Sequence, residues 1–122
     1  LHHADPTIAA LYADIRQTLG LPFVNTDYRA FARWPSYFNP AWTDLRSILL
    51  REEYEHAVRR VHDTAVSLAC GLPNLSGIIP QQLIGCAEQD GQLNEVLSVV
   101  RLFQWLLPGL VVNVAVFRHQ LL

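Results

Sequence analysis

The chain has 122 residues, of which 51% are hydrophobic and only 16% are charged, and its formal net charge is −2. This length fits one domain, and the small negative charge excludes a basic field that would hold nucleic acid or an anionic membrane surface. All nine basic residues are arginine, which excludes Schiff-base chemistry and a P-loop lysine. So apolar a composition in so short a chain predicts an extra apolar face against a partner or a missing segment.

The cysteines and the chain start bear on the cellular compartment. Cys70 and Cys86 are too few for a disulfide framework, so we expect two small buried residues in a reducing, cytoplasmic protein. The polar start does not resemble a signal peptide, and the lack of an initiator methionine favours a piece of a longer protein. The apolar run 102–117 is shorter than the roughly 20 residues of a membrane span, so a buried core helix is predicted there.

The first predicted helix has the clearest start and stop signals in the chain. Asp5 can cap it, Pro6 suits its first position, and Gly20 suits its end. Apolar residues recur between these signals at the spacing of one helical face: Ile8, Leu11, Tyr12, Ile15 and Leu19. Leu21-Pro22 ends the pattern, because a residue before proline is biased away from helical backbone.

Two further helices are predicted around a group of aromatic residues. The first runs from about Thr26 to Trp34 and is stopped by Pro35, and the second begins at Pro40 with Asn39 as its N-cap. The aromatic residues either pack in the core or line a cavity with indole N–H donors: Trp34, Tyr37, Phe38 and Trp42.

The rest of the chain is also predicted to be helical. A helix is expected from Glu52 to about Ala69 with its apolar stripe turned inward, a short one at 80–87, and a long apolar segment at 92–121. Pro108-Gly109 either kinks this last segment or divides it into two helices. Because no stretch alternates with the period of a strand, the predicted fold is all-α, a single compact domain of six to seven helices.

The stretch 21–30 holds the main candidate for chemistry. It runs from an apolar strip into a polar trio at a predicted helix N-terminus: Asn25, Thr26 and Asp27. Asp27 is either a helix-start carboxylate that satisfies backbone N–H groups, or a general base that Phe23 and Val24 desolvate. The spacing of the residues alone favours the first interpretation.

A second candidate is Asn113, the one polar member of the last apolar stripe. It either bridges helix backbone near Pro108 or points a polar group into a ligand cavity. The spacing of the histidines and cysteines offers no metal site, and no nucleotide-binding loop or serine-hydrolase motif occurs.

Three segments, in their order along the chain, resemble the group I 2-haloacid dehalogenases, the D- and L-acting hydrolytic kind: Tyr12–Arg16, Leu21–Ala30 and Arg33–Tyr37. Leu106–Leu110 with Asn113 also fits. The resemblance spans essentially the whole chain, 1–122. It implies an all-α fold of two tandem repeats with the active site between them, and this chain resembles the second repeat.

The resemblance also implies roles for individual residues. Asp27 holds the position of the family's catalytic aspartate, which activates a water that attacks the halogen-bearing carbon with no ester intermediate. Thr26 helps to bind substrate, Phe23 matches a wall of the site, and Asn39 and Asn113 are candidates for the family's site asparagines. A small 2-haloalkanoate of either hand and water are the implied ligands, with no cofactor and no metal.

The first repeat is absent, and with it half of the implied pocket. We therefore expect a fragment, a cleaved chain, or a single-repeat relative that completes its pocket with a second copy. Two alternatives to an active enzyme stay open. One is a non-catalytic helical module whose apolar face binds a partner chain, and the other is a relative that kept the fold and lost the activity.

Overall fold

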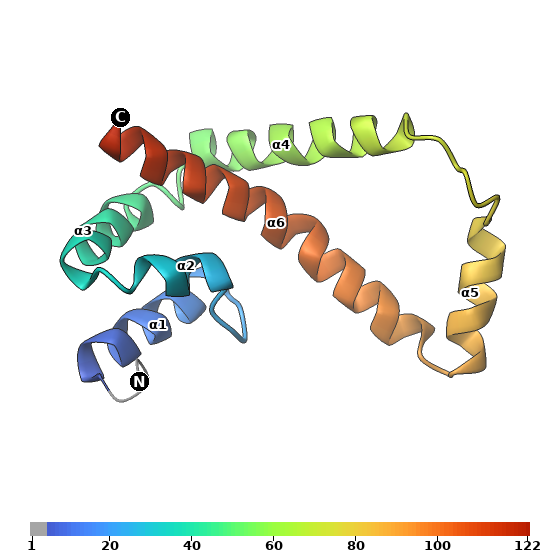
Figure 1. Cartoon of the computed structure of the whole chain (residues 1–122), viewed down its shortest axis with the longest axis horizontal. Coiled ribbons are helices and arrows are strands. Elements are labelled where there is room, and N and C mark those ends of the chain that lie inside the picture. The colour runs from blue at the N-terminus through green and yellow to red at the C-terminus, as the bar shows by residue number, and fades with distance from the viewer. Residues whose placement is uncertain (1–4) are drawn as a thin grey trace. The chain divides into compact units, whose positions relative to one another are not determined.

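A computed structural model of the chain describes residues 5–122, and every regular element in that range is an α-helix (Figure 1). The helices are α1 (Pro6–Leu19), α2 (Thr26–Phe31), α3 (Pro35–Arg46), α4 (Glu52–Cys70), α5 (Pro80–Gln89) and α6 (Leu93–Leu121). The predicted all-α fold of six to seven helices is therefore confirmed, with six helices in residues 5–122. The chain divides into a first unit, residues 5–50 with His119–Leu122, and a second unit, Arg51–Arg118.

Helix α1 begins and ends as its sequence predicts. Asp5 Oδ1 accepts a hydrogen bond from the backbone N–H of Thr7 at 2.8 Å, and Pro6 follows in the first helical turn. Gly20 ends the helix with φ of 68°, a left-handed conformation that glycine adopts without a Cβ penalty. Four of the five residues predicted for its apolar face are buried, and the fifth, Leu19, is half-buried: Ile8, Leu11, Tyr12 and Ile15 are the buried ones.

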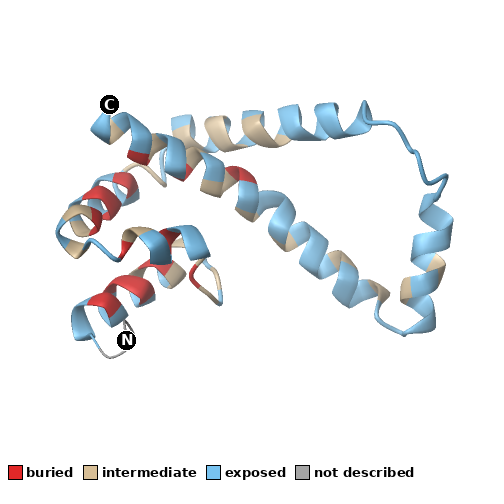
Figure 2. Ribbon diagram, viewed as in Figure 1, coloured by how far each residue is buried: buried red, intermediate tan, exposed pale blue. Residues whose placement is uncertain are grey.

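The core of the first unit lies among α1, α2 and α3 (Figure 2). The ring of Tyr28 packs against Phe38 and Trp42, with centroid distances of 6.4 and 6.2 Å. Trp42 Nε1 donates a hydrogen bond to Asp14 Oδ2 at 2.8 Å, and Arg46 Nη1 lies 3.5 Å from the same oxygen. Each such aromatic pair contributes about 1 kcal/mol beyond the area it buries. Aromatic packing therefore holds α2 to α3, and the Asp14 carboxylate joins α1 to α3.

The boundary between α2 and α3 differs from the prediction. Helix α2 ends at Phe31, and α3 begins at Pro35 rather than at Pro40. Proline costs no hydrogen bond in the first helical turn, so Pro35 can start a helix as readily as it can stop one. Pro40 lies inside α3, where its missing N–H removes one backbone bond.

Two residues at this boundary were predicted wrongly as a result. Asn39 lies inside α3 and is not an N-cap, since Trp34 takes that position and its carbonyl accepts from the Phe38 N–H at 2.9 Å. Trp34 was expected to pack in the core or to line a cavity, but it is 59% exposed. Phe38 and Trp42 do pack in the core, whereas Tyr37 is half-buried.

Two polar contacts join α4 to α6, and their order along the two helices shows that the helices run antiparallel. Tyr54 Oη donates a hydrogen bond to Asn113 Oδ1 at 2.8 Å, and Gln104 Nε2 lies 2.8 Å from His62 Nε2. The His62 ring stacks on Trp105 with centroids 4.0 Å apart and planes at 12°. The Trp105 ring therefore covers one face of the His62 ring.

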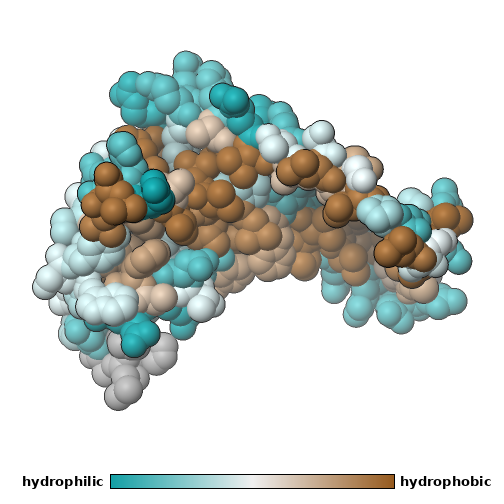
Figure 3. All heavy atoms as spheres, turned by 45° about the horizontal axis from the view of Figure 1, so that its top comes forward, coloured by the Kyte–Doolittle hydropathy of each residue, from teal (hydrophilic) through white to brown (hydrophobic). Residues whose placement is uncertain are grey.

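The second unit leaves most of its apolar side chains exposed. No residue of α4 or α5 is buried, and the buried residues of α6 are Pro108, Asn113 and Phe117. Figure 1 shows α4 and α6 diverging, with α5 between their far ends. Figure 3 shows apolar side chains gathered on the surface in view, and the exposed ones of this unit include Val66, Leu68, Leu72, Leu83, Val99 and Val100.

Several predictions of burial are wrong for this unit. Ala65, Leu68 and Ala69 are exposed instead of turned into a core. Cys70 and Cys86 are free and exposed, not buried. The amphipathic pattern predicted which side of α4 is apolar, but it carried no information on what covers that side.

Helix α6 is one helix of 29 residues that continues through Pro108, so of the two alternatives predicted for Pro108-Gly109 the division into two helices is wrong. The segment 102–117 is also not the buried core helix that we expected. By length and composition α6 could cross a membrane, and only 6% of its most apolar window is buried. The core helix of a soluble protein can have the same length and composition, so these two properties alone do not assign α6 to a membrane.

Candidate active site

The connection from α1 to α2 is held firmly in the first unit. Leu21 N–H bonds to Arg16 O at 3.0 Å after the turn at Gly20, and Val24 is buried. Arg29 Nε donates a hydrogen bond to Val24 O at 3.2 Å. The Arg29 guanidinium also lies over the ring of Tyr12, with its central carbon 5.7 Å from the centroid. These contacts fix the backbone that leads into the polar trio.

The polar trio lies at the N-terminus of α2, as predicted. Asn25 is the N-cap residue, and its carbonyl accepts from the N–H groups of Tyr28 and Arg29 at 3.1 and 3.3 Å. Its side chain forms no capping bond, and within residues 5–122 the buried Asn25 Oδ1 has no hydrogen-bond partner. Thr26 and Asp27 occupy the first turn of α2, next to this cap.

Asp27 is exposed on the surface of the first unit. Neither the predicted capping bond nor an ion pair engages its carboxylate within the described part of the chain. The expectation that Phe23 and Val24 desolvate Asp27 is wrong in this chain, since Val24 is buried in the core and Phe23 is half-buried. A carboxylate in bulk water does not hold a substrate or a water molecule in place, so the described residues do not enclose a site around Thr26 and Asp27.

The two candidate asparagines lie in different units. Asn39 shares the first unit with Asp27, where it is half-buried and its carbonyl accepts from Thr43 Oγ1 at 2.9 Å. Asn113 belongs to the second unit, is 1% exposed and accepts the hydroxyl of Tyr54. A Cβ at Gly109 would lie 3.6 Å from Tyr54 Oη, so a small residue there leaves room for this contact. Asn113 therefore bridges α6 to α4, an arrangement that neither interpretation of its sequence position had included.

Comparison with known proteins gives relatives by sequence but no match to a family model. An (R)-2-haloacid dehalogenase of Pseudomonas putida is 39% identical over 121 residues, which are 99% of this chain and 40% of that protein. An (R)-2-haloacid dehalogenase of Rhizobium sp. (strain NHG3) is 45% identical over 73 residues, 60% of this chain and 28% of that protein. A configuration-inverting 2-haloacid dehalogenase of Alcaligenes xylosoxydans xylosoxydans is 29% identical over 94 residues, 77% and 30% of the two chains.

Two solved structures are similar as well. A D-2-haloacid dehalogenase mutant in complex with D-2-CPA and a D-2-haloacid dehalogenase in complex with L-LA each give a TM-score of 0.80, at 36% and 37% identity. Each covers 99% of this chain and 41% or 42% of the solved chain. The chain is homologous to 2-haloacid dehalogenases. It spans 40% of the length of the Pseudomonas putida relative.

Two side chains lie beside predicted site residues in the structure but were not themselves predicted as site residues. Arg29 stands three residues after Thr26, so helical spacing alone places both on one side of α2. Tyr54 was predicted only as an inward apolar residue, and no local pattern ties it to Asn113, 59 residues away.

The first unit has a pocket that none of the predicted site residues line. Of the aromatic residues that were expected in the core or at a cavity wall, only Tyr37 lines it. It has a volume of roughly 460 Å³ and is lined by Tyr37, Pro40, Ala41, Asp44, Gln120 and Leu121. Gln120 Nε2 spans it by donating to Asp44 Oδ2 at 2.9 Å and to Ala41 O at 3.1 Å. Its position does not connect it to the polar trio of α2.

Proposed function

We propose that the protein to which this chain belongs hydrolyses 2-haloalkanoic acids to 2-hydroxy acids. The observation that carries the proposal is the 39% identity to an (R)-2-haloacid dehalogenase across 99% of the chain. The matched region includes Asp27 and Thr26, which stand together on an open edge of the first unit. Because the chain spans 40% of that relative, the activity belongs to the whole protein and not to these residues alone.

Asp27 is the proposed general base. Its carboxylate takes a proton from a water molecule while the water oxygen attacks the carbon that carries the halogen. The new C–O bond forms as the C–halogen bond breaks, and the halide leaves with the bonding electron pair on the opposite side. This step inverts the configuration and forms no ester with the protein, and one of the relatives is named configuration-inverting.

The remaining candidates are proposed to hold the substrate. The Thr26 hydroxyl donates to the substrate carboxylate, and Phe23 forms part of the apolar wall beside it. Asn39 and Asn113 are proposed as amide donors to the substrate in the whole protein, and Asn113 Oδ1 already accepts the Tyr54 hydroxyl in this chain. An anionic substrate about 6 Å from the Asp27 carboxylate is repelled by roughly 3 kcal/mol at an effective dielectric constant of about 20, so the site also needs a cation.

Both enantiomers are proposed substrates, because the water and the halide only have to exchange sides of the reacting carbon. The printed names of two relatives specify the R configuration and those of the solved structures specify D. A site limited to that enantiomer is therefore the narrower alternative. Halide release from the separate enantiomers of 2-chloropropanoate distinguishes the two.

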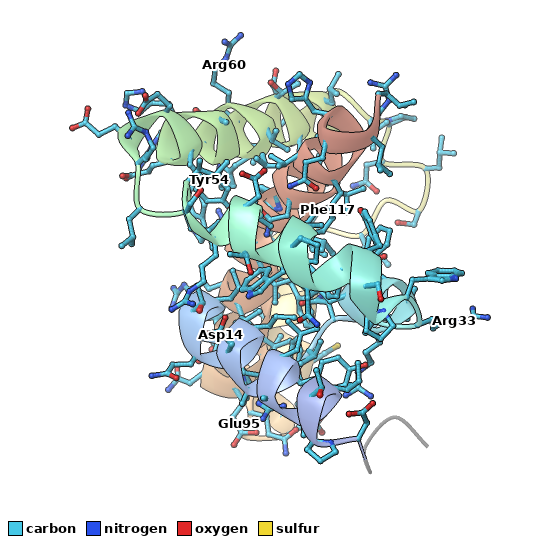
Figure 4. All side chains as sticks on the ribbon, turned by 90° about the vertical axis from the view of Figure 1, so that its left-hand side faces the viewer. Asp14, Arg33, Tyr54, Arg60, Glu95 and Phe117 are labelled. Carbon is cyan, nitrogen blue, oxygen red and sulfur yellow. The ribbon has the colours of Figure 1, made fainter. Side chains whose placement is uncertain are left out.

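The second wall of the site is proposed to come from the part of the protein outside this chain, either another repeat or a second copy. The exposed apolar residues of α4, α5 and α6 are the surface that this partner covers. A membrane is a poorer partner for α6, since its Asn113 bonds to Tyr54 of α4, and α4 exposes charged residues such as Arg60 (Figure 4). The cytoplasmic location remains a proposal based on composition.

Halide release by the whole protein tests the assignment of the base. We expect Asp27→Asn to lower kcat by about 100-fold to 10,000-fold, the usual contribution of general-base catalysis. Asp90→Asn, at an exposed carboxylate after α5, is the matched control and should keep full activity. Undiminished turnover in Asp27→Asn would remove Asp27 from the mechanism.

Single-turnover hydrolysis in ¹⁸O-water tests the proposed direct attack of water. We expect the label in the 2-hydroxy acid and none in the protein. Label in the carboxylate of the protein would favour an ester intermediate. A folded whole protein that releases no halide from either enantiomer would support the alternative of a relative without activity.

A further inference from the structure

We propose that Arg29 binds the carboxylate of the substrate at the α2 edge of the site. The inference rests on the proposed function, which places an anionic substrate next to the anionic Asp27. A cation close to both is the simplest means of offsetting their repulsion, and the chain contains arginine but no lysine. The cation must also be held in place, because a freely moving side chain loses entropy when it binds an ion.

The head group of Arg29 is held by two contacts. Its Nε donates to Val24 O at 3.2 Å, and its guanidinium lies over the Tyr12 ring at 5.7 Å. Val24 precedes Thr26 by two residues, so the guanidinium has turned back toward the N-terminus of α2. Thr26 and Arg29 are three residues apart on this helix and therefore share a face.

The two contacts leave the forked end of Arg29 unused. Within residues 5–122, no carboxylate forms an ion pair with it, although three other arginines have one: Arg46 with Asp14, Arg51 with Glu53, and Arg59 with Glu55. The Nη groups of a guanidinium match the two oxygens of a carboxylate in a bidentate pair. A held cation with a free fork, on the same helix face as the Thr26 hydroxyl, therefore fits the carboxylate end of a 2-haloalkanoate.

Arg33 provides the comparison within the same region. It also stacks on an aromatic ring, with its guanidinium 5.3 Å from the Trp34 centroid. It forms no ion pair in the described part of the chain, and Figure 4 shows its side chain pointing away from the helices. Arg33 thus matches Arg29 in charge and in type of ring contact but lacks the hydrogen bond to the backbone before α2.

The plainer interpretation is that Arg29 only fastens the connection between α1 and α2. In that case its loss lowers the stability of the fold and affects charged and neutral ligands equally. A carboxylate site behaves differently, since its loss affects only ligands that carry the carboxylate. A neutral amide of the same size as the product acid separates the two interpretations.

The experiment uses the whole protein with Arg29→Gln, Arg29→Lys and the control Arg33→Gln. Steady-state halide release from 2-chloropropanoate gives kcat and KM. Calorimetry gives the affinities for 2-hydroxypropanoate and for 2-hydroxypropanamide. Thermal unfolding of each variant reports on stability.

We expect Arg29→Gln to raise KM by about 10-fold to 100-fold, the range for a lost hydrogen-bonded charge pair, with kcat changed much less. The preference for 2-hydroxypropanoate over its amide should fall by the same factor. Arg29→Lys should recover part of that preference, because it keeps the charge but loses the fork. Arg33→Gln should change neither quantity.

Two outcomes would overturn the inference. One is an unchanged preference for the acid over the amide in Arg29→Gln, and the other is an equal loss of both ligands together with a lower unfolding temperature. Failure of the proposed function is separate: the protein would release no halide, yet calorimetry would still show whether acid binding depends on Arg29.

Discussion

The two units of the chain bury their apolar residues to very different extents. In the first unit, short helices enclose the aromatic side chains of Tyr28, Phe38 and Trp42, which are at most 2% exposed. In the second unit, α4 and α5 bury none of their residues, and Leu68 is 69% exposed. Both units have amphipathic helices, so the difference lies in whether the apolar face meets a partner within the described residues.

The two units therefore differ in their relation to the candidate site. The first unit holds the helix with the candidate base, and the second offers an uncovered apolar surface. Asp27 stands on α2, whose Tyr28 is fixed in the core of the first unit, so contacts within this chain position the helix that carries the candidate base. The second unit instead offers an apolar surface with little core behind it. Since homologous dehalogenases are longer than this chain, the rest of the protein is the proposed partner of that surface.

The largest expected effect is the loss of the first unit's core. Trp42→Ala removes the buried ring and its bond to Asp14, which we expect to lower the free energy of unfolding by about 3–5 kcal/mol. Denaturant unfolding measures this change. The control Trp34→Ala removes an exposed indole and should cost about 0.5 kcal/mol or less. Equal losses in both variants would contradict the packing described for this unit.

The contact between α4 and α6 is expected to contribute less. Tyr54→Phe leaves the buried Asn113 Oδ1 without this donor, so we expect a loss of about 1–3 kcal/mol in the free energy of unfolding. The double variant with Asn113→Leu should lose less than the sum of the single changes, because the hydrogen bond that the two side chains share is then lost only once. Strict additivity would mean that the two side chains do not interact.

Two glycines, one in each unit, should respond in opposite directions. Gly20→Ala meets no neighbouring atom, but its φ of 68° disfavours a Cβ, so we expect a loss of about 1 kcal/mol. Gly85 lies inside α5 with open space around it, and Gly85→Ala should stabilise that helix by roughly 0.5–1 kcal/mol. Thermal unfolding of both variants checks the signs, and a gain from Gly20→Ala would contradict the left-handed turn after α1.

Caps and prolines, which act locally, predicted most of the helices. The surroundings of the candidate site residues depend on contacts between residues far apart in the sequence. Asp5, Pro6 and Gly20 fixed α1 because caps act within one turn of a helix end. Pro35 was ambiguous, since the same residue stops one helix and starts the next, and the interpretation of Asn39 as a cap failed with it.

The environment of the site residues could not be obtained in this way. The exposure of Asp27 depends on which segments pack over it, and the Tyr54 hydroxyl that bonds to Asn113 comes from another helix 59 residues away. The position of the trio at the start of α2 was predictable, because an N-cap and a first turn are local features. The contacts of Arg29 with Tyr12 and Val24 needed the structure.

A substitution on the exposed apolar face of α4 should have the smallest effect on the stability of this chain but a large effect on that of the whole protein. Leu68→Ala removes a side chain that is 69% exposed here, so in the 122-residue chain we expect a loss of about 0.5 kcal/mol or less. If the rest of the protein covers this face of α4, the same substitution should cost about 2–5 kcal/mol there, because it then opens a cavity in a packed interface. Unfolding measurements on both proteins give the two values, and an equally small loss in the whole protein would show that α4 keeps its apolar face in water.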